Sequence, residues 1–400
     1  MQSVIDWQPE KPFEIIPQAW LSPDKETYFF CDLHADAGAF LRSLKLSGLI
    51  TESSELDQVQ LTDKAFQGRI LIGGDCFDKG PSNLQLFELL NHLREAGLDL
   101  ILLAGNHDIR VYAGLLALDF MHDLRQAHFF VRMGRKCATF LAEVYHRYCV
   151  HEEAPKLADS LIEEALFPNE DWYRLFPQYA QYFMKRKQIE KEIKQIRSKR
   201  IDFMQACHEK GLNLNQVYHA ALKAKQLFVD SDGEFAWFFQ NLQLLHHSGS
   251  YLFCHAGVDD SIALCMQENG SDSLNEQFRN QMRSGQIFEM YYSPYGNIFR
   301  TKYRDKDWPF SSMGAETLRQ QGIFALVNGH RSHENGQQLF VREGLLNFEC
   351  DTQLNSNCRK KSKMKPHGEA VTIFSSSGTV FAYCCDMPTA KSFHPGRLSA

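Results

Sequence analysis

The sequence has few of the features that mark membrane proteins or nucleic-acid-binding proteins. No apolar run is long enough to cross a bilayer. The N-terminal stretch MQSVIDWQPEKPFEIIP carries acidic residues early and has no apolar signal core. The formal net charge of −6 provides no general attraction to nucleic acid or to anionic lipid. These absences predict a cytoplasmic protein without a membrane partner, for which nucleic-acid binding is not expected.

Several common catalytic and metal-binding motifs are also missing. No glycine-rich loop is followed by lysine and serine or threonine, so a P-loop nucleotide site is not expected. The GVDDS segment and the serines near 375 lack the partners of a nucleophile elbow. The eleven cysteines show no metal-finger spacing, and several lie in strand-like runs such as YFFCD and YLFCHAG. We therefore expect reduced, buried thiols in a reducing compartment.

What the sequence does contain is a set of five short apolar runs that each end in polar residues. They read TYFF–CDLHADAG, RILI–GGDCFDKG, DLILLA–GNHD, GSYLF–CHAGVDD and GIFALV–NGHRSH. This pattern is typical of an α/β sheet covered on both faces, in which ligands bind beyond the carboxyl ends of the strands. The chain of 400 residues, 44% of them hydrophobic, is long enough for one large domain with an insertion or for two domains.

The region from about 111 to 245 has a different pattern. Long amphipathic stretches replace the strand signals, and QIEKEIKQIRSKRIDFM places Ile189, Ile193, Ile196 and Phe203 along one helix face. Residues 185–200 hold eight basic and two acidic side chains, which form either a solvated helix face or a basic arm that helps to hold an anionic substrate or partner. We predict a helical insertion at 111–245, a site of substrate choice, between the two halves of one domain, 1–110 and 246–400.

Polar side chains of the metal-ligand type follow all five apolar runs. They are Asp32 and His34, Asp75 and Asp78, Asn106, His107 and Asp108, His255, and His330. If residues 32–34 remain extended, the side chains of Asp32 and His34 leave the same face of the chain. Carboxylate, imidazole and amide oxygen together suit divalent ions such as manganese, iron or zinc. Each motif alone is a common loop or core feature, but the ordered set indicates a metal site.

The order DxH…GDxxDKG…GNHD…HAG…GH resembles the calcineurin-like metallophosphoesterase superfamily. The segments DLHADAGAFLRSL, GDCFDKGP and FCHAGV are most similar to its branch of Ser/Thr protein phosphatases and symmetrical diadenosine tetraphosphate hydrolases. This resemblance implies a four-layer α/β/β/α sandwich of two mixed sheets, with the insertion as a helical cap beside the site. The strand-like runs after residue 335 are expected to complete the second sheet.

The same resemblance implies a centre of two divalent metal ions. Asp32, His34 and Asp75 would hold the first ion. Asp75 would bridge to the second, which Asn106, His255 and His330 would also hold. Manganese is expected, and iron, zinc, nickel or cobalt suit the same donors. Two such ions clamp the phosphate oxygens and activate a shared water, the bridging hydroxide, for in-line attack on phosphorus.

The resemblance also implies roles for residues other than the metal ligands. His107 would be the general acid, and Asp78 would orient it. Lys79 stands where relatives have arginine and would contact phosphate as a point charge. Arg300, in SPYGNIFR, resembles a phosphate-binding arginine, although a structural role there is an open alternative. Arg331 would either reach substrate or cover the rim of the site.

The sequence departs from the family pattern at several positions. Cys31, Ala35 and Asp36 replace the usual residues around the first aspartate and histidine, and Ala104 and Asp108 replace the arginine and glutamate around GNHE. The SAPNYC segment of the protein phosphatases has no counterpart. These departures count against a standard protein phosphatase.

The reaction predicted by these motifs is hydrolysis of a phosphomonoester, and the partner is a phosphorylated small molecule or phosphoprotein. The alternative within the same chemistry is a nucleotide pyrophosphatase or phosphodiesterase similar to the diadenosine polyphosphate hydrolases. Two other classes of function remain as alternatives to a phosphoesterase. A non-enzymatic binding scaffold would be expected to have lost some of the metal ligands named above. A nuclease would be expected to have a basic groove for its nucleic-acid substrate. His333 follows His330 at a spacing one residue too long for the GHxH of other branches, so we do not expect it to be a ligand.

Overall fold

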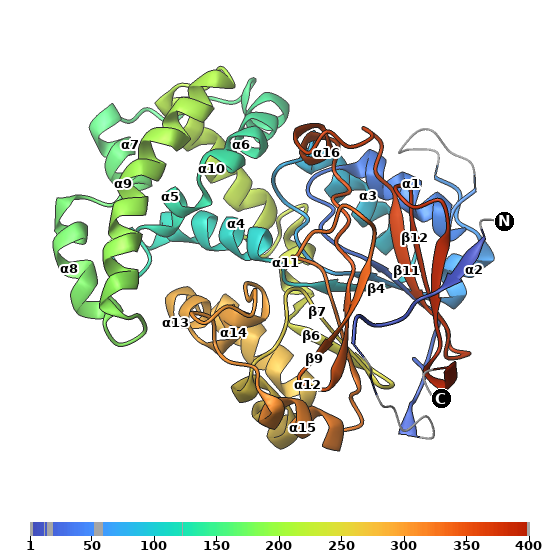
Figure 1. Ribbon diagram of the computed structural model, residues 1–400. Coiled ribbons are helices and arrows are strands. Elements are labelled where there is room, and N and C mark those ends of the chain that lie inside the picture. Colours follow the sequence, from blue (N-terminus) through green and yellow to red (C-terminus); the bar gives the residue numbers. More distant parts are fainter. Residues whose placement is uncertain (1–2, 12, 14–18, 52–58, 122, 398–400) are drawn as a thin grey trace.

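The computed structural model describes residues 3–11, 13, 19–51, 59–121 and 123–397 (Figure 1). Two β-sheets form its centre, and each contains both parallel and antiparallel pairs. The predicted α/β architecture of two mixed sheets with a helical insertion is confirmed. Among the described residues, no helix is both long enough and apolar enough to cross a membrane.

The first sheet has eight strands, and the second has five. The first contains, in spatial order, β1 (Val4–Asp6), β13 (Ala390–Phe393), β12 (Val380–Cys384), β11 (Ala370–Phe374), β2 (Thr27–Phe30), β3 (Arg69–Ile72), β4 (Asp99–Leu103) and β5 (Leu242–Gln243). The second contains β6 (Leu245–Ser248), β7 (Tyr251–Cys254), β8 (Ala325–Asn328), β10 (Leu345–Glu349) and β9 (Gln338–Arg342).

Aromatic side chains fill the space between the two sheets. The ring of Phe29 in β2 lies 5.8 Å from that of Phe253 in β7, which lies 5.1 Å from Phe374 in β11. The neighbours of Phe29 in β2, Tyr28 and Phe30, point instead into the core beneath the outer helices. Successive strand residues alternate between faces, so these fully apolar strands bury both sides of the sheet.

Helices cover the outer faces of both sheets. Those nearest the first sheet are α1 (Ala37–Ser47), α2 (Asp63–Gln67) and α3 (Asn83–Glu95). Beside the second sheet, α12 (Asp260–Arg283) contacts β6 and packs against α13 (Ile287–Tyr292), α14 (Pro294–Ile298) and α15 (Ser312–Gln320). The short α16 (Ser356–Lys361) lies near α1 and α3 (Figure 1). Together with the two sheets they give the four layers predicted.

A group of helices, called the cap below, stands to one side of the sheets in Figure 1. It follows α4 (Asn106–Leu116) and contains α5 (Phe129–Met133), α6 (Ala138–Val144), a π-helix (Tyr145–Cys149), α7 (Asp159–Leu166), α8 (Glu170–Ala180), α9 (Arg186–Glu209) and α10 (Leu214–Phe228); α11 (Ala236–Gln240) leads back to β5. In α9, Ile189, Ile196 and Phe203 are buried, as the periodicity predicted. The domain boundaries at 110 and 245 stay predictions.

The strands after residue 335 divide between the two sheets. β9 and β10 join the second sheet as expected, but β11, β12 and β13 join the first, where β11 pairs antiparallel with β2. The expectation that all of these strands complete the second sheet is therefore wrong. Apolar strands of this kind fit either sheet, because which edge they pair with depends on contacts far away in the sequence.

Candidate metal centre

The loops after β2, β3, β4, β7 and β8 meet at one end of the two sheets. Because β2, β3 and β4 are parallel, their carboxyl ends lie at the same edge. The N–H of His34 donates to the carbonyl of Asp75 at 2.8 Å, and the N–H of His330 donates to Oδ2 of Asp32 at 2.8 Å. The structure thus brings together residues that are almost 300 positions apart in the chain.

Most of these residues have left-handed backbone conformations. Asp32 and His34 have φ of 53° and 44°, so the segment is a turn and the condition of an extended chain at 32–34 is not met. Of eleven described non-glycine residues with positive φ, seven lie in these loops: Asp32, His34, Ala35, Asp75, Asp78, Lys79 and His330. Such conformations cost of order 1–3 kcal/mol each and persist where surrounding contacts enforce them.

Two glycines allow the loops to approach one another. A Cβ on Gly105 would lie 2.0 Å from the backbone nitrogen of Asp75, and one on Gly329 would lie 2.1 Å from Oδ2 of Asp32. Neither position can therefore accept a side chain without displacing a ligand-type carboxylate or its backbone. This explains why glycine precedes both Asn106 and His330 in the sequence.

The first group of ligand-type atoms comes from Asp32, His34 and Asp75, which lie within 4.8 Å of one another and are all buried. Nδ1 of His34 donates to the carbonyl of Phe77 at 3.1 Å, which leaves the lone pair of Nε2 for the interior of the group. Nε2 lies 3.8 Å from Oδ1 of Asp32 and 3.7 Å from Oδ2 of Asp75. The ammonium of Lys79 lies against this same Nε2, so a cation already contacts the group.

The second group comes from Asp75, His255 and His330, whose ligand atoms again lie within 4.8 Å of one another. Nδ1 of His255 donates to the carbonyl of Gly73 at 2.7 Å. Its Nε2 is buried without a hydrogen-bond partner and lies 3.5 Å from Oδ1 of Asp75. Nε2 of His330 is likewise buried and unpartnered. Nε2 of His255 and Oδ1 of Asp75, two acceptors that face each other, fit a shared cation.

The charges of the two central carboxylates support the same conclusion. Burial, together with the neighbouring charge of Asp75, raises the pKa of Asp32 to about 7. For Asp75, burial acts in the same direction, but His255, His107 and His34 outweigh it and hold its pKa well below the usual range. Two buried carboxylates side by side repel each other, and a divalent cation between them removes that repulsion. The residues present therefore fit the predicted metal ions.

Asn106 lies at the edge of the second group. A half-turn of its amide would let the nitrogen donate to Nδ1 of His330 at 2.9 Å and the oxygen accept from Arg110 at 3.3 Å. Without that half-turn, as in the structure, the amide oxygen itself faces Nδ1 of His330, so two acceptors lie side by side, an arrangement that fits a cation between them. Arg110 was not predicted from the sequence, although its spacing of four residues after Asn106 places both on one face of α4.

His107 and Asp78 form a buried pair beside the two groups. Nδ1 of His107 lies 2.7 Å from Oδ2 of Asp78, and Nε2 lies 3.9 Å from Oδ2 of Asp75. The backbone N–H of His107 also donates to Oδ1 of Asp75 at 2.8 Å. The structure thus places the predicted acid and its predicted orienting residue in contact, next to the central carboxylate. Their catalytic roles stay predictions.

Asp108 is a residue that the sequence reasoning noted only as a departure from the family pattern. Its fully buried carboxylate accepts backbone N–H groups from two of the five loops, those after β3 and β4: Gly105, Asp75, Cys76 and Phe77, at 2.8–3.2 Å. Each oxygen accepts two of these donors. Asp108 therefore fixes the position of the central carboxylate without belonging to either group.

We expect Asp108→Asn to lower the free energy of unfolding by about 3 kcal/mol, because either orientation of the new amide turns its NH2 against two buried N–H groups. Urea unfolding followed by circular dichroism measures this change. The matched control is Asp305→Asn at an exposed position, for which we expect a change within about 0.5 kcal/mol. Equal stabilities of the two variants would contradict the role of Asp108.

The predicted substrate-binding arginines lie outside the two groups. The guanidinium of Arg300 lies 4.3 Å from the ring centre of Tyr291 and donates to the carbonyl of Gly296 at 2.7 Å. Arg331 donates to Oε1 of Glu349 at 2.6 Å, and Nε2 of His333 lies 2.8 Å from Oε2 of the same carboxylate. His333 thus contacts Glu349 and belongs to neither group, as expected from its spacing. Substrate contact by Arg300 and Arg331 stays a prediction.

Comparison with protein-family models and with curated proteins gives no match. Among solved structures, the chain is similar to a cold-active protein tyrosine phosphatase, with a TM-score of 0.49, 14% identity, and coverage of 97% of this chain and 81% of that one. A cold-active protein tyrosine phosphatase of a psychrophilic Shewanella species has a TM-score of 0.45, 14% identity, and coverage of 98% and 90%. For a protein serine/threonine phosphatase from Saccharomyces cerevisiae, these values are 0.33, 12%, 88% and 73%.

Proposed function

We propose that the protein is a metal-dependent phosphatase that hydrolyses phosphomonoesters. The observation that carries this proposal is the buried carboxylate of Asp75, which two groups of ligand-type residues share, with His107 beside it. Asp32, His34 and Asp75 would hold one ion, and Asp75, Asn106, His255 and His330 would hold the other. When bound, such ions supply positive charge to the phosphate oxygens and lower the pKa of a water between them.

The remaining residues of the site would position the phosphate and supply a proton. The ammonium of Lys79 lies at the first group, where it would contact a phosphate oxygen. Nδ1 of His107 is held by Asp78, so Nε2 is the atom that would carry a proton to the leaving oxygen. The pairing with Asp78 fixes the orientation of the imidazole ring, much as a carboxylate does in other catalytic pairs.

The protonation of His107 depends on opposing contributions. Burial lowers its pKa, and Arg110 acts in the same direction, whereas Asp75 and Asp78 raise it without reversing the shift. A phosphate dianion bound beside the ring adds further negative charge and favours the imidazolium form. Protonation would therefore accompany substrate binding.

The proposal is tested with p-nitrophenyl phosphate and the purified full-length chain. After dialysis against a chelator, we expect hydrolysis to fall to background, and added manganese should restore it. Hydrolysis that survives removal of the metal would contradict the proposal. Bis(p-nitrophenyl) phosphate separates the two reactions, because faster hydrolysis of this diester would favour the phosphodiesterase alternative instead.

A further inference from the structure

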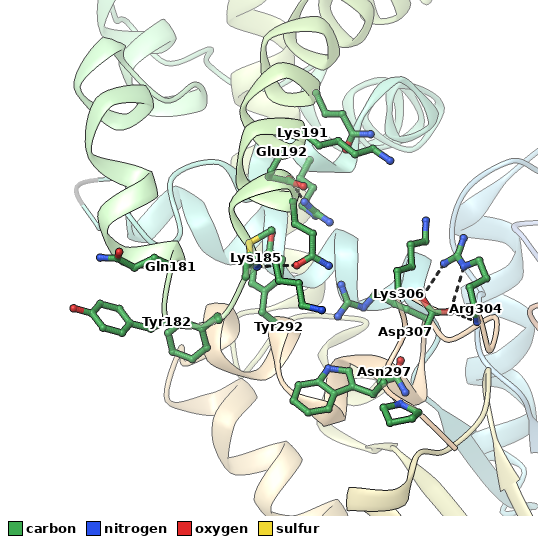
Figure 2. Close-up of a pocket in the computed structure, with 18 residues that line it drawn as sticks. Gln181, Tyr182, Lys185, Lys191, Glu192, Tyr292, Asn297, Arg304, Lys306 and Asp307 are labelled. Carbon is green, nitrogen blue, oxygen red and sulfur yellow. Dashed lines mark hydrogen bonds and ion pairs between the residues drawn. The ribbon is translucent and has the colours of Figure 1, made fainter. Parts of the chain in front are cut away.

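A cavity of about 770 Å³ lies between the beginning of α9 in the cap and the segment 292–309 (Figure 2). One face of α9 lines its cap side through Gln188, Lys191, Glu192 and Gln195, which repeat at three- and four-residue spacing. The opposite side contains Arg300, Arg304, Lys306 and Trp308. The volume suits a small organic molecule, because ligand pockets measure roughly 300–1,000 Å³.

The side chains that line this cavity carry an excess of positive charge. Six are basic and two are acidic: Arg132, Lys185, Lys191, Arg300, Arg304 and Lys306, against Glu192 and Asp307. Both carboxylates already pair with arginines of the lining, Glu192 with Arg132 and Asp307 with Arg304. Figure 2 shows Lys185 and Lys191 on the cap side and Lys306 on the opposite side. None of these three lysines has a carboxylate partner within the described part of the chain.

The three arginines of α9 are arranged differently. Arg186 pairs with Glu190, Arg197 with Glu170, and Arg200 with Glu163, all on exposed parts of the helix. Pairs of this kind are typical of a solvated helix face. Lys191 of α9 and Lys185 directly before it instead line the cavity, so this end of the helix is the part that would act as the basic arm considered from the sequence.

Positive side chains also connect the cavity with the metal centre. The segment that lines the cavity packs against the loops of the metal centre: the N–H of Ala256, next to His255, donates to the carbonyl of Ile298 at 2.9 Å, and Arg331, next to His330, donates to the carbonyl of Thr301 at 3.2 Å. Arg110 contacts the amide of Asn106 at one end. At the other end, Lys199 donates to the backbone carbonyl of the lining residue Arg132 at 3.3 Å, and burial, together with the charges of Arg132 and Arg110, lowers its pKa to about 8. A multiply charged anion that extends from the centre into the cavity would compensate this crowding of cations.

We propose that the substrate carries at least two phosphate groups, and that the cavity binds a phosphate that is not hydrolysed while another lies at the metal centre. The proposal rests on the proposed phosphatase function and extends it to a class of small molecule. A substrate with a single phosphate could occupy the metal centre or the cavity, but not both. Lys185, Lys191 and Lys306 would contact the second phosphate as point charges from both sides of the cavity.

Binding of inorganic tripolyphosphate tests this proposal without turnover. Isothermal titration calorimetry is performed on the full-length chain at low salt without added metal, since tripolyphosphate chelates metal ions. The triple variant Lys185→Gln/Lys191→Gln/Lys306→Gln should weaken binding of tripolyphosphate on the order of tenfold or more, because three charge contacts are lost. Orthophosphate, with a single phosphate, should lose much less affinity. For the wild-type chain, salt should weaken tripolyphosphate binding more steeply than orthophosphate binding.

The matched control is Lys187→Gln/Lys194→Gln/Lys210→Gln, which removes the same charge from exposed positions in and just after α9 that do not line the cavity. Equal losses of tripolyphosphate affinity in the two triple variants would overturn the proposal. So would a hexaglutamate peptide that binds the wild-type chain as tightly as tripolyphosphate, since this would assign the cavity to acidic peptides. Failure of the wild-type chain to hydrolyse p-nitrophenyl phosphate would refute the proposed phosphatase function while leaving this binding result to stand.

Discussion

Asp75→Asn is expected to remove both metal ions and to lower kcat for p-nitrophenyl phosphate about a thousandfold or more. Asp75 is the one residue shared by both groups, with its two oxygens directed at different histidines. An amide supplies one neutral oxygen in place of two charged ones, so neither ion keeps its shared ligand. The stabilisation of the transition state by metal ions is worth several kcal/mol, which corresponds to this loss of rate.

Metal content and activity are measured on the same preparations. Inductively coupled plasma mass spectrometry after dialysis with manganese gives the stoichiometry, and steady-state kinetics gives kcat. Oδ1 of residue 75 can still accept the backbone N–H of His107, so the variant is expected to fold. The control is the exposed Asp305→Asn, which should retain full metal content. A variant at position 75 that keeps both ions would contradict the shared-ligand arrangement.

The second large effect is expected at His107. His107→Asn should lower kcat about 100- to 10,000-fold for an alkyl phosphate and leave the metal content unchanged, because general acid catalysis contributes that range. The loss should be much smaller for p-nitrophenyl phosphate, since nitrophenolate leaves without needing a proton. Kinetics with both substrates, together with the metal analysis, measure the difference.

Two further variants define the origin of this effect. Asp78→Asn keeps the imidazole but removes the charge that orients it, so we expect a smaller loss with the same dependence on the leaving group. His151→Asn at an exposed position serves as the control and should leave both rates unchanged. Equal losses for the two substrates in His107→Asn would exclude a role as general acid and would indicate a role in binding.

The sequence predicted those parts of the molecule that depend on local pattern. Apolar runs with a polar end indicated the strands β2, β3, β4, β7 and β8, and the three- and four-residue spacing of isoleucines indicated α9. These signals are local because the alternation of a strand and the period of a helix repeat within a few residues. The ligand-type residues were visible for the same reason, since each directly follows its strand.

The tertiary structure decided which of these residues contact one another. Asp108 looked like a variant motif residue, but its carboxylate fixes the loop that carries Asp75, more than thirty positions earlier. Arg331 and His333 both contact Glu349, a partner that the sequence did not indicate. Arg359 lies in the polar, basic segment SNCRKKSKMKPHG, yet it is fully buried in α16 and pairs with Asp386. None of these partners could be deduced from spacing.

The sequence by itself therefore determined the chemical character of the site: which carboxylates, imidazoles and amide lie at strand ends, and in what order. Only the tertiary structure decided that Asp75 is common to two groups, that β11–β13 join the first sheet, and that the cations of α9 and Lys306 face one cavity. The physical reason is that a side chain's type and its local backbone follow from neighbouring residues, whereas its partners follow from packing between distant segments.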